Sequence, residues 1–167
     1  MPLIVKFVSY LFNSLFPVSC LLCGAYGNDV CEPCRTAFTW PKYQKRKWIT
    51  SFLNYRDPRA ERILRHIKSM PNQRVADFLG RLFSERILNR PRDPHDWIFI
   101  PIPISRTRLR ERGFNQSILI ARAMSHYFLF PVITNVLIKR IHTKKQGTSR
   151  SRSERSKNIL GSFSVRH

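Results

Sequence analysis

An α/β domain, with a parallel sheet flanked by helices, is the fold class that the sequence predicts for residues 48–167. Short apolar runs alternate with amphipathic stretches along this part of the chain. Residues 97–104 are apolar at nearly every position, as in a parallel strand that helices cover on both faces. The apolar content of 43% is enough for a core in a chain of 167 residues.

Residues 1–17 precede this domain and predict an amphipathic helix. Leucine or phenylalanine stands at positions 3, 7, 11 and 15, which a helix gathers on one side. The segment is too short and interrupted for a convincing membrane span, and it lacks the marks of a signal peptide. Packing against the rest of the protein and shallow association with a membrane surface both stay open.

Residues 18–40 carry four cysteines as two C-x-x-C pairs, Cys20 with Cys23 and Cys31 with Cys34. Two pairs this close favour tetrahedral zinc ligation in a knuckle over structural disulfides or unligated thiols. A closed site of four thiolates is structural, and its metal supplies much of the folding energy of so small a module. Cysteines that bind zinc instead of forming disulfides also imply a reducing compartment, so we expect a cytoplasmic protein.

The first half of the α/β domain reads as strand, helix, helix and strand. Residues 49–55 predict a first strand. Asp57 and Pro58 are an N-cap and an N1 proline for a short helix that ends before Pro71. A second helix with a broad apolar face follows over residues 72–87, and residues 97–104 are the clearest predicted strand.

Residues 105–116 concentrate basic side chains. Four arginines recur at every second position, opposed only by Glu111. A helix would place like charges at i,i+4, so we predict a loop or short extended segment whose guanidinium groups converge on one polyanion. A strand end, a cationic loop and a helix N-terminus, with a turn glycine and an asparagine N-cap, together predict an anion site. Its candidate residues are Arg106, Arg108, Arg110, Arg112, Gly113, Asn115 and Gln116.

The remaining elements are a helix to about Phe128, a strand over residues 132–138 and a strand over residues 161–165. Residues 139–157 are polar and basic, which is typical of a solvated or disordered run. No histidine set, acidic pair or Cys-His arrangement predicts a catalytic residue, so the catalytic residues stay unknown.

The charge of the chain points to a polyanionic partner. The formal net charge is +20 and the pI is about 11.1. Nucleic acid, a phosphorylated small molecule and an anionic membrane all fit such an excess. Phosphate neutralisation would make nucleic-acid binding steeply dependent on salt.

Several short motifs follow one another along the chain: the paired C-x-x-C, P-I-P from Pro101, R-x-R-x-R-G-F-N-Q from Arg108, Lys139-Arg140, T-x-x-Q from Thr143, R-S-E-R-x-x-N from Arg152 and G-S-F-S-V from Gly161. In this order, they resemble the motifs of the ComF family of phosphoribosyltransferase-like proteins, which are tied to natural competence and DNA uptake. The resemblance runs from Phe16 to the end of the chain and implies a type I phosphoribosyltransferase-like fold after an N-terminal zinc ribbon. It also implies that residues 139–163 form a mobile loop of the folded domain. Single-stranded DNA and proteins of the competence machinery become expected partners, with a location at the inner membrane face as one option.

The chain departs from this pattern in one respect. A phosphoribosyltransferase grips phosphoribosyl pyrophosphate with two adjacent acidic residues in a later loop, and this sequence has no adjacent acidic pair. We therefore expect a C-terminally truncated family member without the final strand and helix. Two alternatives stay open. One is an active, Mg²⁺-dependent phosphoribosyltransferase, if the chain is a fragment; the other is a zinc-ribbon adaptor protein.

Overall fold

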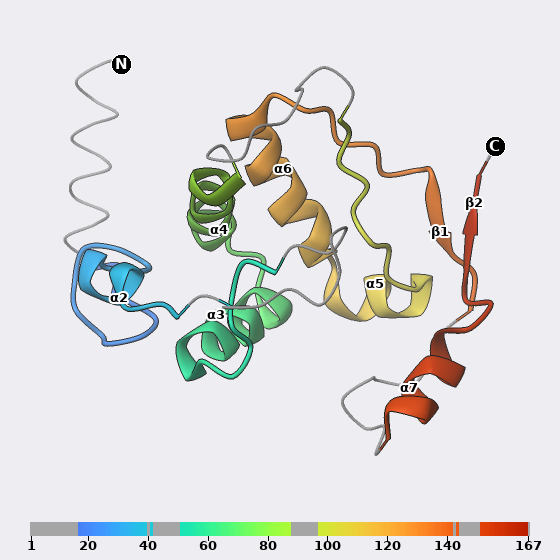
Figure 1. Cartoon of the computed structure of the whole chain (residues 1–167), viewed down its shortest axis with the longest axis horizontal. Helices are drawn as coiled ribbons and strands as arrows, with labels where there is room; N and C mark the ends of the chain where they lie inside the picture. Colours follow the sequence, from blue (N-terminus) through green and yellow to red (C-terminus); the bar gives the residue numbers. More distant parts are fainter. Residues whose placement is uncertain are drawn as a thin grey trace. The chain divides into compact units, whose positions relative to one another are not determined.

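The structure is a computed structural model that describes residues 17–39, 41, 51–87, 97–141, 143 and 151–166 (Figure 1). The predicted N-terminal helix lies almost wholly outside these residues. The chain divides after Met70 into two compact units, which are described separately below. In the described part of the chain, no helix has the length and apolar character needed to cross a membrane.

The first unit begins with a tight loop that carries the first cysteine pair. Ser19 and Tyr26 form an antiparallel bridge, and the amide of Gly27 donates to the carbonyl of Val18 at 2.8 Å. Gly24 and Gly27 both adopt positive φ, of 79° and 115°, which only glycine reaches at low cost. The short helix α2 (Glu32–Thr36) then follows, with a proline in its first turn.

Helix α3 (Pro58–Ser69) starts at the predicted Asp57 N-cap and ends before Pro71. Ile63 and Ile67, one turn apart on this helix, are completely buried. The strand predicted for residues 49–55 is wrong where it can be examined, because residues 51–55 form bends and turns. Within these turns the amide of Asp57 donates to the carbonyl of Asn54 at 2.9 Å, whereas the amide of Asn54 donates to the carbonyl of Thr39 at 3.3 Å and so joins two segments of the first unit.

Two helices form the core of the second unit. Helix α4 (Gln73–Ile87), for which a broad apolar face was predicted, packs against α6 (Gln116–Phe128) (Figure 1). Gly80 of α4 lies against Ala123 of α6 so closely that an added Cβ would stand 2.7 Å from the carbonyl carbon of Ala123. Small residues therefore set how near the two helix backbones approach.

The run of alternating arginines is a helix, α5 (Arg106–Arg112), and the prediction of a loop is wrong. Ser105 caps its N-terminus, accepting from the amide of Arg108 at 3.3 Å, and Gly113 ends it in the left-handed region. An N-cap stabilises a helix by about 1 kcal/mol. Exposed like charges at i,i+4 cost only a few tenths of a kcal/mol, so the caps outweigh them.

Residues 97–104 run extended but pair with residues 131–133 through a single parallel bridge, Phe99 with Val132. The amide of Phe99 donates to the carbonyl of Pro131, and the amide of Ile133 donates to the carbonyl of Phe99, both at 2.9 Å. The ring of Phe99 also packs on Phe128 and Phe130, with centroids 5.8 Å and 5.7 Å away. The chain thus returns parallel to itself after α6, as a β-α-β unit does.

Two short strands near the end of the chain pair antiparallel to each other. Strand β1 (Leu137–Lys139) pairs with β2 (Phe163–Val165), with Ile138 opposite Ser164. Between the two strands lies helix α7 (Arg152–Ile159), where the composition predicted a solvated run. The described residues contain this two-stranded sheet and the one parallel bridge, so the larger parallel sheet of the phosphoribosyltransferase-like fold stays a prediction.

Candidate metal centre and basic pocket

The four cysteines converge at one point in the first unit. The sulfur atoms of Cys20, Cys23, Cys31 and Cys34 all lie within 4.8 Å of one another. None of them is in a disulfide, and the Sγ atoms of Cys23 and Cys31 are 3.5 Å apart, well beyond a disulfide bond length. Four thiol groups in this arrangement can hold a metal ion. The predicted ligand set is therefore confirmed as a cluster.

The backbone of the loop prepares the cluster for negative charge. Burial alone would raise the pKa of Cys20, but amide donors from Cys31, Cys23 and Leu22 together lower it to about 6. The opposite happens at Cys34, where a hydrogen bond to the sulfur of Cys31 and burial raise the pKa to about 12. Four thiols this close resist ionising together, and a bound cation removes that conflict.

The second unit has a basic pocket between the start of α5 and the end of β1. Its volume is about 370 Å³. Six residues line it, and three of them carry a positive charge: Ser105, Arg106, Thr107, Ile138, Lys139 and Arg140. Across the part of the chain that the structure describes, no Asp or Glu forms an ion pair with these three cations. The pocket therefore concentrates uncompensated positive charge.

Lys139 is the least exposed of the three cations and is held from two sides. Its Nζ donates to the hydroxyl of Thr143 at 3.0 Å and lies 5.1 Å from the centroid of the Phe163 ring. Burial lowers the pKa of Lys139, and the positive charge of Arg108 lowers it further. An anion in the pocket would relieve both effects, because it supplies the negative charge that the protein does not.

Arg140 is hydrogen-bonded to β2 and to the residue that precedes this strand. Its Nε donates to the hydroxyl of Ser164 at 2.7 Å, and its amide donates to the carbonyl of Ser162 at 2.9 Å. The guanidinium retains further N–H groups, since only Nε is used in this contact. The strand pairing thus presents Lys139 and Arg140 together beside Arg106.

The predicted anion-binding residues divide into two groups. Arg106 lines the basic pocket, and the positive charge of Arg108 acts on Lys139. Arg110 is an exposed residue of α5. The other four have structural roles. Arg112 donates to the side chain of Gln116 at 2.7 Å, and its guanidinium lies 6.0 Å from the ring centroid of Phe114. Gly113 ends α5. Asn115 caps α6, and its side-chain amide donates to the carbonyl of Ile102.

Two pocket residues, Lys139 and Arg140, were absent from the predicted anion site. The sequence does contain a signal for them, a Lys-Arg pair at the end of a predicted strand. Only the folded chain brings that pair beside Arg106.

Comparison of the chain with protein-family models, with curated proteins and with solved structures found no match. The functional inference therefore rests on the geometry of the cysteine cluster and the basic pocket.

Proposed function

We propose that this protein is a zinc-stabilised, ComF-like protein that binds the phosphate groups of single-stranded DNA through its basic pocket. The observation that carries the proposal is the convergence of Arg106, Lys139 and Arg140 without an acidic partner among the described residues. Guanidinium and ammonium groups are the side chains that recognise phosphate most strongly. The net charge of +20 adds a long-range attraction for the same partner.

Zinc is the metal that the cysteine cluster fits best. Four thiolates form a soft, tetrahedral ligand set, which selects zinc over magnesium or calcium. With Zn–S bonds of about 2.3 Å, a regular tetrahedron has sulfur atoms about 3.8 Å apart. The observed cluster accommodates that spacing, since its sulfurs lie within 4.8 Å of one another. A closed set of four protein ligands gives zinc a structural role here.

A role in DNA uptake, with proteins of the competence machinery as partners, follows from the resemblance of the sequence motifs to the ComF family. Binding to single-stranded DNA is the part of this proposal that the pocket supports directly. Lys139 and Arg106 come from different elements, so both can contact one phosphate or two successive phosphates of an extended strand.

The test is a salt titration of binding to a fluorescent oligothymidine, with Arg106→Gln as the variant. We expect the variant to bind about 10-fold more weakly than the native chain, because it loses one charge-assisted hydrogen bond to phosphate. The slope of log affinity against log salt should fall by about 0.7, the value for one lost phosphate contact on a single strand.

Arg81→Gln is the matched control, because Arg81 is an exposed arginine of α4 and the change removes the same charge. We expect it to change affinity by less than about twofold. The proposal fails if the native chain does not bind oligothymidine at low salt or if its affinity does not depend on salt concentration. It also fails if both variants weaken binding equally.

A second experiment, thermal unfolding with added ligands, discriminates the enzyme alternative. An active transferase should be stabilised against heat by phosphoribosyl pyrophosphate with Mg²⁺, and more strongly than by pyrophosphate with Mg²⁺. Equal stabilisation by the two ligands would mean that the ribose is not recognised and would favour simple phosphate binding.

A further inference from the structure

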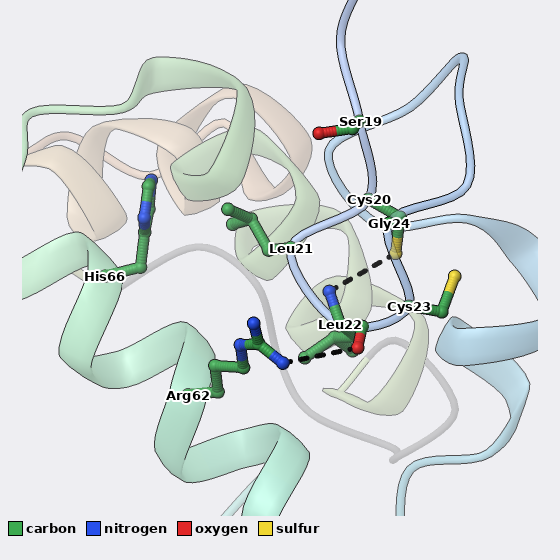
Figure 2. Close-up of a pocket in the computed structure, with 8 residues that line it drawn as sticks. All are labelled: Ser19, Cys20, Leu21, Leu22, Cys23, Gly24, Arg62 and His66. Atoms are coloured by element: carbon green, nitrogen blue, oxygen red, sulfur yellow. Dashed lines mark hydrogen bonds between the residues drawn. The ribbon is translucent and has the colours of Figure 1, made fainter.

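A second cavity lies within the first unit, between the cysteine loop and α3, and it is separate from the basic pocket. Its volume is about 580 Å³, within the range of pockets that bind small molecules. Residues 19–24 form one wall, and Arg62 and His66 of α3 form the other (Figure 2). The two α3 side chains lie one helical turn apart, so both project toward the loop.

Arg62 differs from the other arginines of α3. Arg59 pairs with Asp57 at 2.9 Å, and Arg65 pairs with Glu61 at 2.7 Å. Arg62 has no carboxylate partner among the described residues, and its guanidinium makes one long contact of 3.4 Å to the carbonyl of Leu22. Figure 2 shows this contact at the edge of the cavity. Most of its N–H donors are therefore left for a ligand.

The other lining groups suit a phosphate joined to an apolar body. The hydroxyl of Ser19 can donate a hydrogen bond, and the imidazole of His66 lines the wall beside Arg62. Leu21 and Leu22 supply apolar surface beside them. No Asp or Glu of the described chain lines the cavity, so nothing there repels an anion except the cysteine thiolates.

Two backbone amides partly offset the negative charge of a thiolate at Cys20. The amides of Leu22 and Cys31 both point at the sulfur of Cys20, at 3.5 Å each. A bound Zn²⁺ would cancel two of the four thiolate charges, and Arg62 stands on the opposite wall of the cavity. An anion is therefore favoured at the α3 side, away from the sulfurs.

We propose that this cavity binds the phosphate of a nucleotide-sized ligand, with Arg62 as the main contact and with His66 and Ser19 in support. The proposal goes beyond the proposed DNA binding, because it assigns a second anion site to the first unit. A free mononucleotide and the backbone of a nucleic acid share this chemistry. The loop of residues 19–24 forms the wall, so binding depends on the metal that holds the loop.

The experiment measures binding of deoxyadenosine monophosphate to the zinc-loaded full chain by calorimetry, with deoxyadenosine and an unphosphorylated oligothymidine as comparison probes. We expect the monophosphate to bind, and deoxyadenosine to bind at least about 10-fold more weakly, because it lacks the phosphate. Binding of the monophosphate alone would identify a terminal phosphate as the ligand. Competition between oligothymidine and the monophosphate would identify the nucleic-acid backbone.

Arg62→Gln should weaken monophosphate binding by about 10- to 100-fold. Arg65→Gln is the matched control on the same helix, since Arg65 is already paired, and it should change binding by less than about twofold. Arg106→Gln should leave this site intact, which separates the inference from the proposed function.

Zinc content and thermal unfolding show whether Arg62→Gln is folded. Should it lose its metal, Arg62→Lys replaces it, and we expect about 10-fold weaker binding because the planar guanidinium fork is lost. The proposal is overturned if the monophosphate does not bind or if deoxyadenosine binds equally well. It is also overturned if the folded Arg62 variant binds the monophosphate as tightly as the native chain does, or if Arg106→Gln is the variant that loses this binding.

Discussion

Asp57 shows how one side chain joins two segments of the first unit. Its carboxylate is buried and accepts hydrogen bonds from the amide and hydroxyl of Thr39, both at 3.0 Å. It also accepts from the amide, Nε and Nη2 of Arg59. The hydrogen-bonded guanidinium of Arg59 holds the pKa of this carboxyl well below its usual range, against the opposing effect of burial. The ionised carboxylate of Asp57 therefore stabilises the folded state.

We expect Asp57→Asn to lower the free energy of unfolding by about 2 kcal/mol at pH 7, because it loses charge-assisted hydrogen bonds. Since the folded pKa is depressed, the advantage of the native chain is complete above the unfolded pKa of about 3.9 and declines below it. Urea unfolding of both chains at pH 7 and pH 3 measures the difference, which should shrink in acid.

Glu61→Gln is the control for this substitution, since it also changes a carboxylate to an amide, within the first turn of α3. Glu61 pairs with an exposed arginine, so we expect an effect below about 1 kcal/mol. If Asp57→Asn lowered the free energy of unfolding equally at both pH values, the role assigned to the charge of Asp57 would be contradicted.

The packing of α4 on α6 is decided by one missing side chain. Gly80 lowers the intrinsic stability of α4, because glycine in a helix interior is about 1 kcal/mol less favourable than alanine. An added Cβ would stand 2.7 Å from the backbone of Ala123 and 2.9 Å from its Cβ. A backbone atom cannot rotate away, so both helices would have to move apart.

We therefore expect Gly80→Ala to destabilise the protein despite the better helix propensity of alanine. Overpacking costs about 1–3 kcal/mol, which matches or exceeds the propensity gain of about 1 kcal/mol. Thermal unfolding measures the net effect. Arg81→Ala, at the adjacent exposed position, should stay within about 0.5 kcal/mol of the native chain. A more stable Gly80→Ala chain would show that the helices are not in close contact.

At the scale of the whole molecule, the two units are stabilised by different means. The second unit buries apolar faces of α4 and α6 against each other. The loop and α2 in the first unit bury few apolar side chains of their own, among them Cys20, Val30 and Phe38. We therefore expect a metal held by the four cysteines to supply much of the folding energy of so small a module.

We predict that removing zinc with a chelator unfolds the cysteine loop and leaves the α4–α6 pair folded. Hydrogen exchange is the direct measurement. The amides of Cys20, Leu21 and Cys31, which are hydrogen-bonded within the loop, should lose protection, whereas amides in α4 and α6 should keep theirs. Cys34→Ser should reproduce the effect without chelator. Unchanged protection of the loop after complete zinc removal would contradict a structural role for the metal.

Much of the local structure could be predicted because it depends on neighbours in the chain. Asp57 with Pro58 at the start of α3, Asn115 at the start of α6 and the apolar period of α4 all appear as predicted. The arginine helix α5 was predicted wrongly because the repulsion of like charges was weighted above the caps at Ser105 and Gly113. Comparing the magnitudes of these two effects would have favoured the helix.

The sequence by itself determined the candidate metal ligands, the helix caps and the positive charge, since each depends on residue type and on spacing over a few positions. Only the tertiary structure decided that Arg106 meets Lys139 and Arg140, that Gly80 meets Ala123, and that Arg62 faces the cysteine loop. These pairings join segments far apart in the chain. Their geometry depends on how whole elements pack, which no local pattern of residues specifies.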